Sequence, residues 1–434
     1  MFKNNLKENQ IILDILTTIP DYNQGNSYDC TELYGECPKA EEGIYTWKSE
    51  KTEGYIKYPS FIWREPDEND KFPNHHISST FKISYVTRTP KYSGDKPIVF
   101  FLHGVPTNKY QYSEIQKYIS RFLPTIAIDM LGMGASSKPL NYRDINTGEI
   151  SWLWKYDCIY IKELIDNLYP DRKWILVADD WGGGIALTCS TYQGFTKNLL
   201  HMFLLDPISF DGYPVNEIQA IGRASSYDFQ NKKYLEDEDR NVWKFNFELL
   251  MSAFDQTVVQ ILKTMVHDSS KFDQFKLKSY MYPYIETDYT GKYKLNSKTM
   301  TLDYNSIEVL ADRASILSPS LLLPKTDKNS DGIDFSEVNI NMTIIWGKQD
   351  NMMPSKQLWY FKYAFPQVKI SGHFVENAGH FVGVDQPEIV SEIILDHITE
   401  YFGIKTLIKP FFGFGGIYKG SEKEMSGKIM KELY

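Results

Sequence analysis

Short apolar runs alternate with helix-like segments from about residue 81 onward, and this alternation constrains the fold more than any other feature of the chain. The apolar runs are continuous, as in strands that are buried on both faces of a sheet. They span residues 98–104, 125–132, 174–180, 199–206 and 342–350. Helical periodicity fills the intervals around residues 112–121, 151–168, 183–192 and 355–364. Such an order predicts an α/β fold with a mostly parallel sheet and helices on both of its faces.

Two further elements frame this sheet. Residues 81–89 alternate between apolar and polar side chains, which predicts an edge or antiparallel strand. The segment 385–402 predicts the last helix of the core. We expect Asp385 as its N-cap, Pro387 in its first turn and Glu388 three residues on, as in a capping box.

The alternation stops between Asp206 and about Asn339, where the chain is helical and aromatic and has no buried-strand runs. An insertion at the carboxyl ends of the strands lies above the crevice in which such folds bind ligands, so we expect a helical cap after the sixth strand. The expected parts are an N-terminal extension (1–80), a first core segment (81–206), the cap (207–339), a second core segment (340–402) and a Gly/Phe-containing tail (403–434).

Composition excludes several classes of protein. The net charge is −9 without a basic stretch, which disfavours nucleic acid as a partner. No window holds the roughly 18 apolar residues of a membrane span, and the N-terminal segment lacks the features of a secretory signal. These observations favour a cytoplasmic protein that acts on a small molecule, and they leave the oligomeric state open.

Four cysteines are too few for a scaffold built on disulfides. Cys158 and Cys189 lie in helical, apolar surroundings, so we expect small core residues there. Cys30 and Cys37 lie together in a loop-like stretch, where we expect free thiols in a reducing cytosol. The eight histidines show no metal-ligand spacing, so no metal site is expected.

A tight strand-to-helix turn is predicted where an apolar strand meets the sequence DDWGG. A nucleophile on such a turn needs small residues two positions before and two positions after it. With Asp180 on the turn, these positions hold Ala178 and Gly182, whereas Asp179 would place the bulky Trp181 there. Asp180 is therefore the candidate nucleophile. The alternative is a plain strand-end aspartate that caps the next helix.

Two further side chains complete the order nucleophile, acid, histidine. Asp350 follows the strand-like run MTIIWGKQD, and His380 follows FVENAG just before the last helix. All three side chains come at or just after the carboxyl ends of strands, so they can converge on one edge of the sheet. The backbone N–H groups of Val105 and Trp181 are the candidate oxyanion donors. For the segment HGVP, a plain strand-to-helix turn is the alternative.

These motifs resemble the α/β-hydrolase superfamily and, within it, the haloalkane dehalogenase and epoxide hydrolase branch. The matching segments are HGVPTNKYQY, IDMLGMGASSKP, ADDWGGGIAL, WGKQDNMMP and ENAGHFVGVDQPE, which together span about residues 103–388. The resemblance implies an α/β-hydrolase fold and an aspartate that attacks carbon directly, displacing halide or opening an epoxide. Water activated by His380, whose imidazole Asp350 orients, then hydrolyses the resulting ester, and no cofactor is needed.

The choice between the two reactions depends on few residues. PTNKYQY and DMLGMGASSKP look more like the dehalogenases, so a dehalogenase-like hydrolase of a small apolar substrate is our first interpretation and an epoxide hydrolase is the alternative. In the dehalogenases, the Trp after the nucleophile, here Trp181, holds the leaving halide, but epoxide hydrolases frequently carry a Trp there too, so Trp181 is compatible with both reactions. A common second halide donor is an Asn where this chain has Val105. Asn108, or Trp243 of the cap, would have to replace it, although Trp243 also fits plain cap core.

Epoxide hydrolases instead use cap tyrosines that donate hydrogen bonds to the epoxide oxygen. The stretch SYMYPYIETDY offers four candidates, Tyr280, Tyr282, Tyr284 and Tyr289, and no spacing singles out a pair.

Two more aspartates accompany the proposed triad. Asp206 ends its strand where one dehalogenase subgroup carries the acid that orients the histidine, so it competes with Asp350 for that role. The side chain of Asp179 should point away from Asp180, because neighbouring strand residues face opposite sides. If the two came close, repulsion would raise one pKa. A non-catalytic relative with a docking role and a cofactor-free oxygenase remain as alternatives on the same scaffold.

Overall fold

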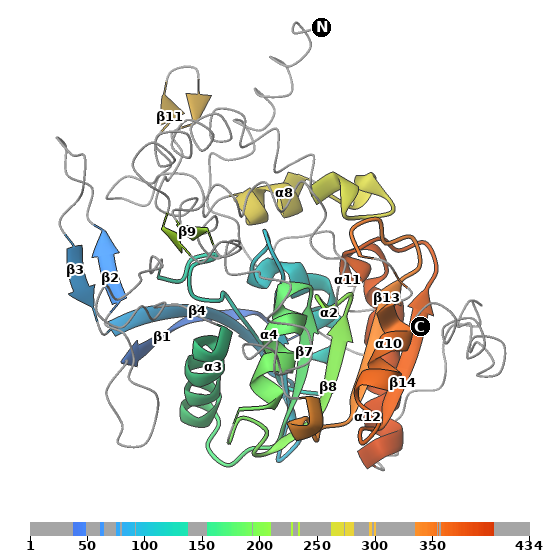
Figure 1. Cartoon of the computed structure of the whole chain (residues 1–434). Helices are drawn as coiled ribbons and strands as arrows, with labels where there is room; N and C mark the ends of the chain where they lie inside the picture. Colours follow the sequence, from blue (N-terminus) through green and yellow to red (C-terminus); the bar gives the residue numbers. More distant parts are fainter. Residues whose placement is uncertain are drawn as a thin grey trace, which may run out of the picture.

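An eight-stranded sheet occupies the centre of the computed structural model (Figure 1). Its order is β1-β4-β6-β5-β7-β8-β13-β14. The two pairs that involve β4, with β1 and with β6, are antiparallel and all other pairs of this sheet are parallel, so the expected mostly parallel sheet is confirmed. In chain order the strands are β1 (Glu41–Lys48), β4 (Thr80–Arg88), β5 (Ile98–Leu102), β6 (Thr125–Ile128), β7 (Trp174–Asp179), β8 (Leu199–Leu205), β13 (Met342–Gly347) and β14 (Ile370–Val375).

The structure describes only part of the chain. The described residues are 38–48, 61–64, 75–78, 80–91, 93–137, 154–192, 194–209, 227–228, 233–234, 262–272, 274–281, 295–296, 299–300, 335–353, 355 and 357–402. Short strand pairs outside the main sheet are β2 (Phe61–Arg64) with β3 (His75–Ser78), β9 (Tyr227–Asp228) with β10 (Lys233–Tyr234), and β11 (Leu295–Asn296) with β12 (Thr299–Met300).

The central strands are buried along their whole length. Every residue of β5, β6, β7 and β13 is buried, which explains their continuous apolar sequences IVFFL, TIAI, WILVAD and MTIIWG. Helices cover both faces of the sheet, so neither face of these strands meets water. The five strands expected from apolar runs are all present, each a few residues shorter than its run.

Helices form two pairs on opposite faces of the sheet. The helices are α2 (Ser113–Ile119), α3 (Trp154–Leu168), α4 (Trp181–Ser190), α10 (Gln357–Ala364), α11 (Val382–Asp385) and α12 (Pro387–Phe402). α3 packs on α4, and α2 packs on α12. The crossovers β5–α2–β6 and β6–α3–β7 run in opposite directions across the sheet, so right-handed connections place α2 and α3 on opposite faces.

A disulfide joins the helix pair α3 and α4. Cys158 and Cys189 are bonded, with their Cα atoms 5.0 Å apart. Both are fully buried, so the expected core position is confirmed, whereas the bond between them was not predicted. Helical periodicity shows which side chains face the core and does not show that two of them, 31 positions apart, face each other. Cys30 and Cys37 lie outside the described residues.

Part of the expected N-terminal extension belongs to the main sheet. β1 pairs with β4 along its full length, from Glu41 opposite Thr87 to Lys48 opposite Thr80. β4 is therefore antiparallel, as expected, but it is not an edge strand. The sequence of β1 gave little sign of this role, because Trp47 is its only fully buried residue.

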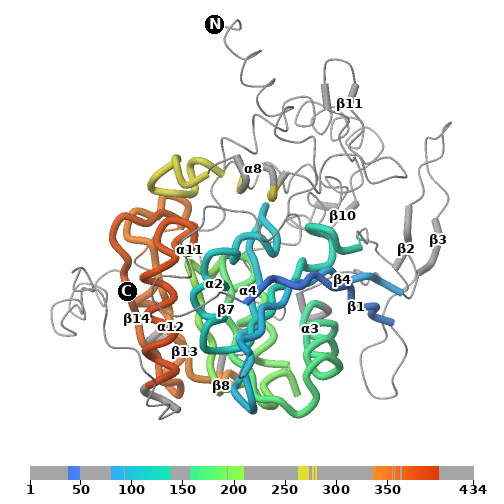
Figure 2. The backbone as a smooth tube through the Cα atoms, turned by 180° about the vertical axis from the view of Figure 1, so that it is seen from behind, coloured from blue at the N-terminus to red at the C-terminus, as the bar shows by residue number. Residues whose placement is uncertain are grey.

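The expected cap is described only in part. Residues 262–272 and helix α8 (Gln274–Met281) lie above the carboxyl ends of the parallel strands in both views (Figures 1 and 2). This part of the insertion follows β8, the sixth strand of the main sheet in chain order. The described residues do not include most of the interval 207–339, Trp243 or the tail 403–434. Within the described part, no helix is both long and apolar enough to cross a membrane.

Candidate active site

Asp180 stands on a strained turn between β7 and α4. Its φ of 49° and ψ of −115° lie in a region that non-glycine residues rarely adopt. The turn is tight because glycines follow it. A Cβ atom on Gly182 would lie 2.3 Å from the Leu102 carbonyl oxygen, and one on Gly183 would lie 2.5 Å from the Pro207 side chain. The strand, turn and helix are those of a nucleophile elbow, in the register predicted from the sequence.

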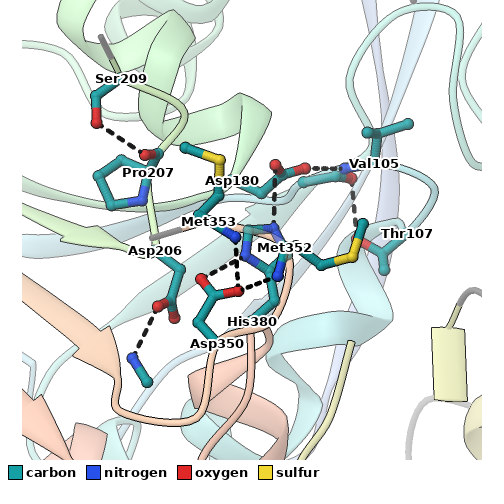
Figure 3. A network of polar contacts seen from close by, with 12 residues as sticks. Val105, Thr107, Asp180, Asp206, Pro207, Ser209, Asp350, Met352, Met353 and His380 are labelled. Carbon is teal, nitrogen blue, oxygen red and sulfur yellow. Dashed lines mark hydrogen bonds and ion pairs between the residues drawn. The ribbon is translucent and has the colours of Figure 1, made fainter. Parts of the chain in front are cut away.

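The loop after β5 supplies a backbone donor to this aspartate. The Val105 N–H donates to Asp180 Oδ2 at 2.8 Å, deep in the protein (Figure 3). The loop approaches closely because residue 104 is glycine, and a Cβ there would lie 2.6 Å from Asp180 Cβ. Trp181, the other candidate donor, is fully buried as the first residue of α4. Such an arrangement favours negative charge on Asp180 Oδ2.

His380 bridges the other two expected residues. Its Nε2 lies 3.3 Å from Asp180 Oδ1, and its Nδ1 lies 2.9 Å from Asp350 Oδ2 (Figure 3). All three side chains are at most 1% exposed. Asp350 follows β13 and His380 follows β14, two parallel strands that end at the same edge as β7. The three residues singled out in the sequence therefore form a continuous chain of contacts.

Asp350 is held firmly by its own loop. The N–H groups of Met352 and Met353 donate to Oδ1 at 2.7 and 2.9 Å. The indole of Trp346 donates to Oδ2 at 3.2 Å. These donors satisfy the carboxylate in its ionised form and fix its orientation, so Asp350 in turn fixes the ring of His380.

The charge state of His380 follows from its two carboxylate neighbours. Burial alone would lower its pKa, but the negative charges of Asp350 and Asp180 outweigh burial and raise the pKa of His380 well above its ordinary value. We therefore expect a protonated imidazole whose Nδ1–H donates to Asp350 and whose Nε2–H faces Asp180. The imidazolium balances one of the two carboxylates.

Asp206 is a second buried acid near these three residues, but its hydrogen bond is to a backbone N–H group and not to His380. Its Oδ1 accepts from the Gly347 N–H at 2.7 Å (Figure 3). Burial raises the pKa of Asp206 well above its ordinary value, and the charge of Asp350 adds to this rise. The raised pKa favours the neutral form of Asp206, whereas Asp350 contacts His380 directly. Of the two acids that competed in the sequence, the structure brings Asp350 to the imidazole.

Asp179 is also fully buried, directly before the candidate nucleophile. Burial raises its pKa well above the ordinary value; His380 opposes the rise and the charge of Asp180 adds to it. The rise that the sequence argument tied to repulsion from Asp180 is therefore present, and its largest cause is burial. The raised pKa favours a neutral Asp179. A neutral side chain there does not repel negative charge on Asp180.

Two of the remaining candidates, Asn108 and Tyr280, are among the described residues. Asn108 Nδ2 donates to the Ser279 carbonyl of α8 at 2.7 Å, and its Oδ1 accepts from the Tyr110 N–H. Tyr280 of α8 is 1% exposed and packs against the ring of Phe272. The side chains of Tyr282, Tyr284 and Tyr289 lie outside the described residues.

Two buried residues near the site were not singled out from the sequence. Gln111 Oε1 accepts from the Gly104 N–H at 3.1 Å and from Thr107 Oγ1 at 2.5 Å, which braces the donor loop. Tyr112 donates to the Leu102 carbonyl at 2.9 Å. Burial raises the pKa of Tyr112 well above its ordinary value, and Asp179, Asp180 and Tyr280 add to it. Their position in PTNKYQY, directly after the HGVP loop, was the signal that could have found them.

Comparison with known proteins agrees with this fold. A family model described as alpha/beta hydrolase fold matches residues 97–387, and the chain therefore belongs to the α/β-hydrolase family. Its relatives include "Epoxide hydrolase 3" of Xenopus tropicalis, 22% identical over 71% of this chain and 74% of that protein. They also include a "Haloalkane dehalogenase" of Bradyrhizobium diazoefficiens, 29% identical over 26% of this chain and 34% of that protein. The chain is thus a hydrolase of the α/β-hydrolase family, and these relatives bear the names of the epoxide hydrolase and dehalogenase branch.

A search of solved structures gives the same fold. A structure titled "Epoxide hydrolase CorEH without ligand" superposes with a TM-score of 0.51 at 18% identity, covering 74% of this chain and 96% of the other. The two chains thus share their fold. Among the described residues, no group of histidine, cysteine or acidic side chains is placed to hold a metal ion.

Proposed function

We propose that the chain hydrolyses small apolar electrophiles through a covalent alkyl ester on Asp180. The observation that carries the proposal is the position of this carboxylate: Oδ2 accepts from the Val105 N–H, and Oδ1 faces His380. An aspartate at a nucleophile elbow attacks saturated carbon, which a serine there would not do. The same atoms serve both halves of the reaction.

In the first half, Asp180 Oδ1 attacks a substrate carbon. For an epoxide, the new C–O bond forms as the ring C–O bond breaks, and the ring oxygen takes a proton. For a haloalkane, the carbon–halogen bond breaks and halide leaves. Oδ2 stays beside the Val105 N–H and becomes the carbonyl oxygen of the ester, where the same donor can stabilise a later negative charge.

In the second half, water attacks Cγ of the ester. Esterification removes the negative charge of Asp180, so one of the influences that raise the pKa of His380 is lost and the imidazole can release its proton. For an epoxide this proton replaces the one that the ring oxygen took, and for a haloalkane it leaves with the halide. The neutral ring, oriented by Asp350, then takes a proton from water as hydroxide adds to the ester. Collapse of the intermediate breaks the ester C–O bond, and the leaving alkoxide takes this proton from the imidazole to give the product alcohol. The carboxylic acid left on Asp180 returns its own proton to the imidazole, which restores the starting charge state.

An epoxide is the substrate class that the described residues favour. Its ring oxygen needs a proton donor, and the buried phenol of Tyr280 lies in the cap helix near Tyr112, which itself neighbours Asp180. The relative from Xenopus tropicalis, which aligns with 71% of this chain, bears the name epoxide hydrolase.

A haloalkane is the second candidate, and Trp181 is the observation that favours it. A fully buried indole directly after the nucleophile suits a leaving halide. Against this, Val105 has no side-chain donor, and Asn108 already donates to Ser279.

Intact-protein mass spectrometry of a His380→Ala variant tests the proposal and chooses between the substrates. Without the base, the ester should accumulate. Styrene oxide would add its whole mass, whereas 1-bromohexane would add its alkyl mass without bromine. The adduct should map to Asp180 and disappear in the Asp180→Asn, His380→Ala double variant. A folded His380→Ala protein that gains neither mass, from these probes or from a wider pool of epoxides and haloalkanes, would contradict the proposal.

A further inference from the structure

One buried carboxylate joins the loop of the candidate histidine to the cap. Asp385, the last residue of α11, was expected to cap helix α12. Instead, its Oδ2 accepts from the Gly379 N–H and from the His267 N–H, each at 2.8 Å. Its Oδ1 accepts from the Asp268 N–H at 3.2 Å. Asp385 is 1% exposed, so these three backbone donors, rather than water, solvate its carboxylate.

The two segments that Asp385 joins come from different parts of the molecule. Gly379 directly precedes His380, whereas His267 and Asp268 belong to the segment 262–272, which precedes α8 in the chain. This segment lies at the upper edge of the core, next to α11 and the end of β14 (Figures 1 and 2). A carboxylate between two chain segments can transmit a displacement of one to the other.

Two more contacts tighten the same junction. The Phe381 N–H donates to the Met265 carbonyl at 2.9 Å. A Cβ atom on Gly379 would lie 2.8 Å from that same oxygen and 2.9 Å from the His267 nitrogen, so the backbones touch. The residues on both sides of His380 are thus fixed to the cap segment, while Asp350 fixes only its ring.

We propose that Asp385 is a positioning residue that holds His380 against the cap segment 265–268, so that the placement of the cap governs the hydrolysis of the ester. This inference rests on the proposed function. Alkylation needs Asp180 and the Val105 donor, neither of which contacts Asp385. Hydrolysis needs His380 within reach of a water molecule beside the ester, and a shift of about 1 Å can slow such a step by about 100-fold. Loss of the junction should therefore slow the second half-reaction selectively.

The test is to measure both half-reactions in an Asp385→Asn variant of the full chain. Asparagine keeps the shape but turns an amide N–H₂ toward backbone N–H groups that need an acceptor. With styrene oxide or 1-bromohexane, rapid quenching and intact-mass analysis give the rates of ester formation and ester loss. We expect ester formation within about two-fold of the wild-type rate and ester loss slower by about 10–100-fold, so that the ester accumulates.

Asp268→Asn is the matched control. Its side chain belongs to the same segment, and within the described part of the chain it accepts hydrogen bonds from Ser270 alone, so both rates should stay at the wild-type values. Gly379→Ala provides a second variant, because its Cβ pushes the loop off the Met265 carbonyl without removing an acceptor. It should show the same selective loss of hydrolysis.

The outcomes separate this inference from the proposed function. No ester in any protein, His380→Ala included, would refute the proposed function itself. An ester that forms in the wild type and disappears equally fast in Asp385→Asn would overturn the positioning role alone. Equal slowing of both steps, or failure of both Asp385→Asn and Gly379→Ala to fold, would show that the junction is purely structural and would also overturn it.

Discussion

Replacing Gly182 with alanine should displace the backbone around the site, because the added Cβ atom would overlap backbone atoms. The added Cβ would lie 2.3 Å from the Leu102 carbonyl oxygen and 2.7 Å from that of His103, where ordinary contacts begin at about 3.4 Å. The end of β5 and the start of α4 must therefore separate by about 1 Å. Because both contacts are to backbone, no side-chain rotation can relieve them.

This separation acts directly on the proposed oxyanion donor. Leu102 and His103 lead into Val105, whose N–H binds Asp180 Oδ2 at 2.8 Å. We expect a loss of about 1–3 kcal/mol in the free energy of unfolding, as for other overpacked sites. The rate of ester formation should fall by about 100-fold, as expected for reacting groups displaced by about 1 Å.

Urea unfolding and quenched intact-mass measurements of ester formation with styrene oxide provide the assay. Gly94→Ala is the control: its φ is +46° and nothing lies within 4 Å of its Cβ, so only about 1 kcal/mol of local strain is expected. Its rate of ester formation should equal that of the wild type. A folded Gly182→Ala variant with wild-type stability and wild-type ester formation would refute the steric reasoning.

Two further predictions concern the core. The Cys158–Cys189 disulfide closes a loop of 31 residues and should contribute roughly 3–4 kcal/mol. A titration of free thiols in the denatured, unreduced chain should find two, those of Cys30 and Cys37. Four free thiols would contradict the bond and would agree with the expected cytoplasmic setting. Burial keeps Asp179 protonated in the folded state, so stability is lost as the pH rises from its ordinary pKa toward the raised one. Asp179→Asn should therefore be more stable than wild type at about pH 7, by an amount that shrinks at about pH 3 in urea unfolding; a difference independent of pH would contradict this.

The parallel sheet and the triad could be predicted because each depends on local sequence signals. Buried strands leave continuous apolar runs, and these runs end where Asp180 and Asp350 stand. The small residues around Asp180 then specify the turn. Fold and candidate site were thus accessible from the same few segments.

The contacts that the sequence did not predict all join segments far apart in the chain. β1 carries a single fully buried side chain, Trp47, so its pairing with β4 left no clear periodicity. Asp385 matched the local pattern of a helix cap, yet its partners His267 and Asp268 lie more than 100 residues away. Local rules cannot choose between a nearby and a distant set of N–H donors.

The fate of oxygen during turnover distinguishes hydrolysis of an Asp180 ester from direct attack of water on the substrate. If hydroxide attacks Cγ of an Asp180 ester, repeated turnover of the wild-type enzyme in H₂¹⁸O must place ¹⁸O in the carboxylate of Asp180, and the first product must carry ¹⁶O from the enzyme. Peptide mass spectrometry should find the label in the peptide that contains Asp180 and nowhere else. Label in the first product, with an unlabelled Asp180, would show that water attacks the substrate directly and would contradict the account.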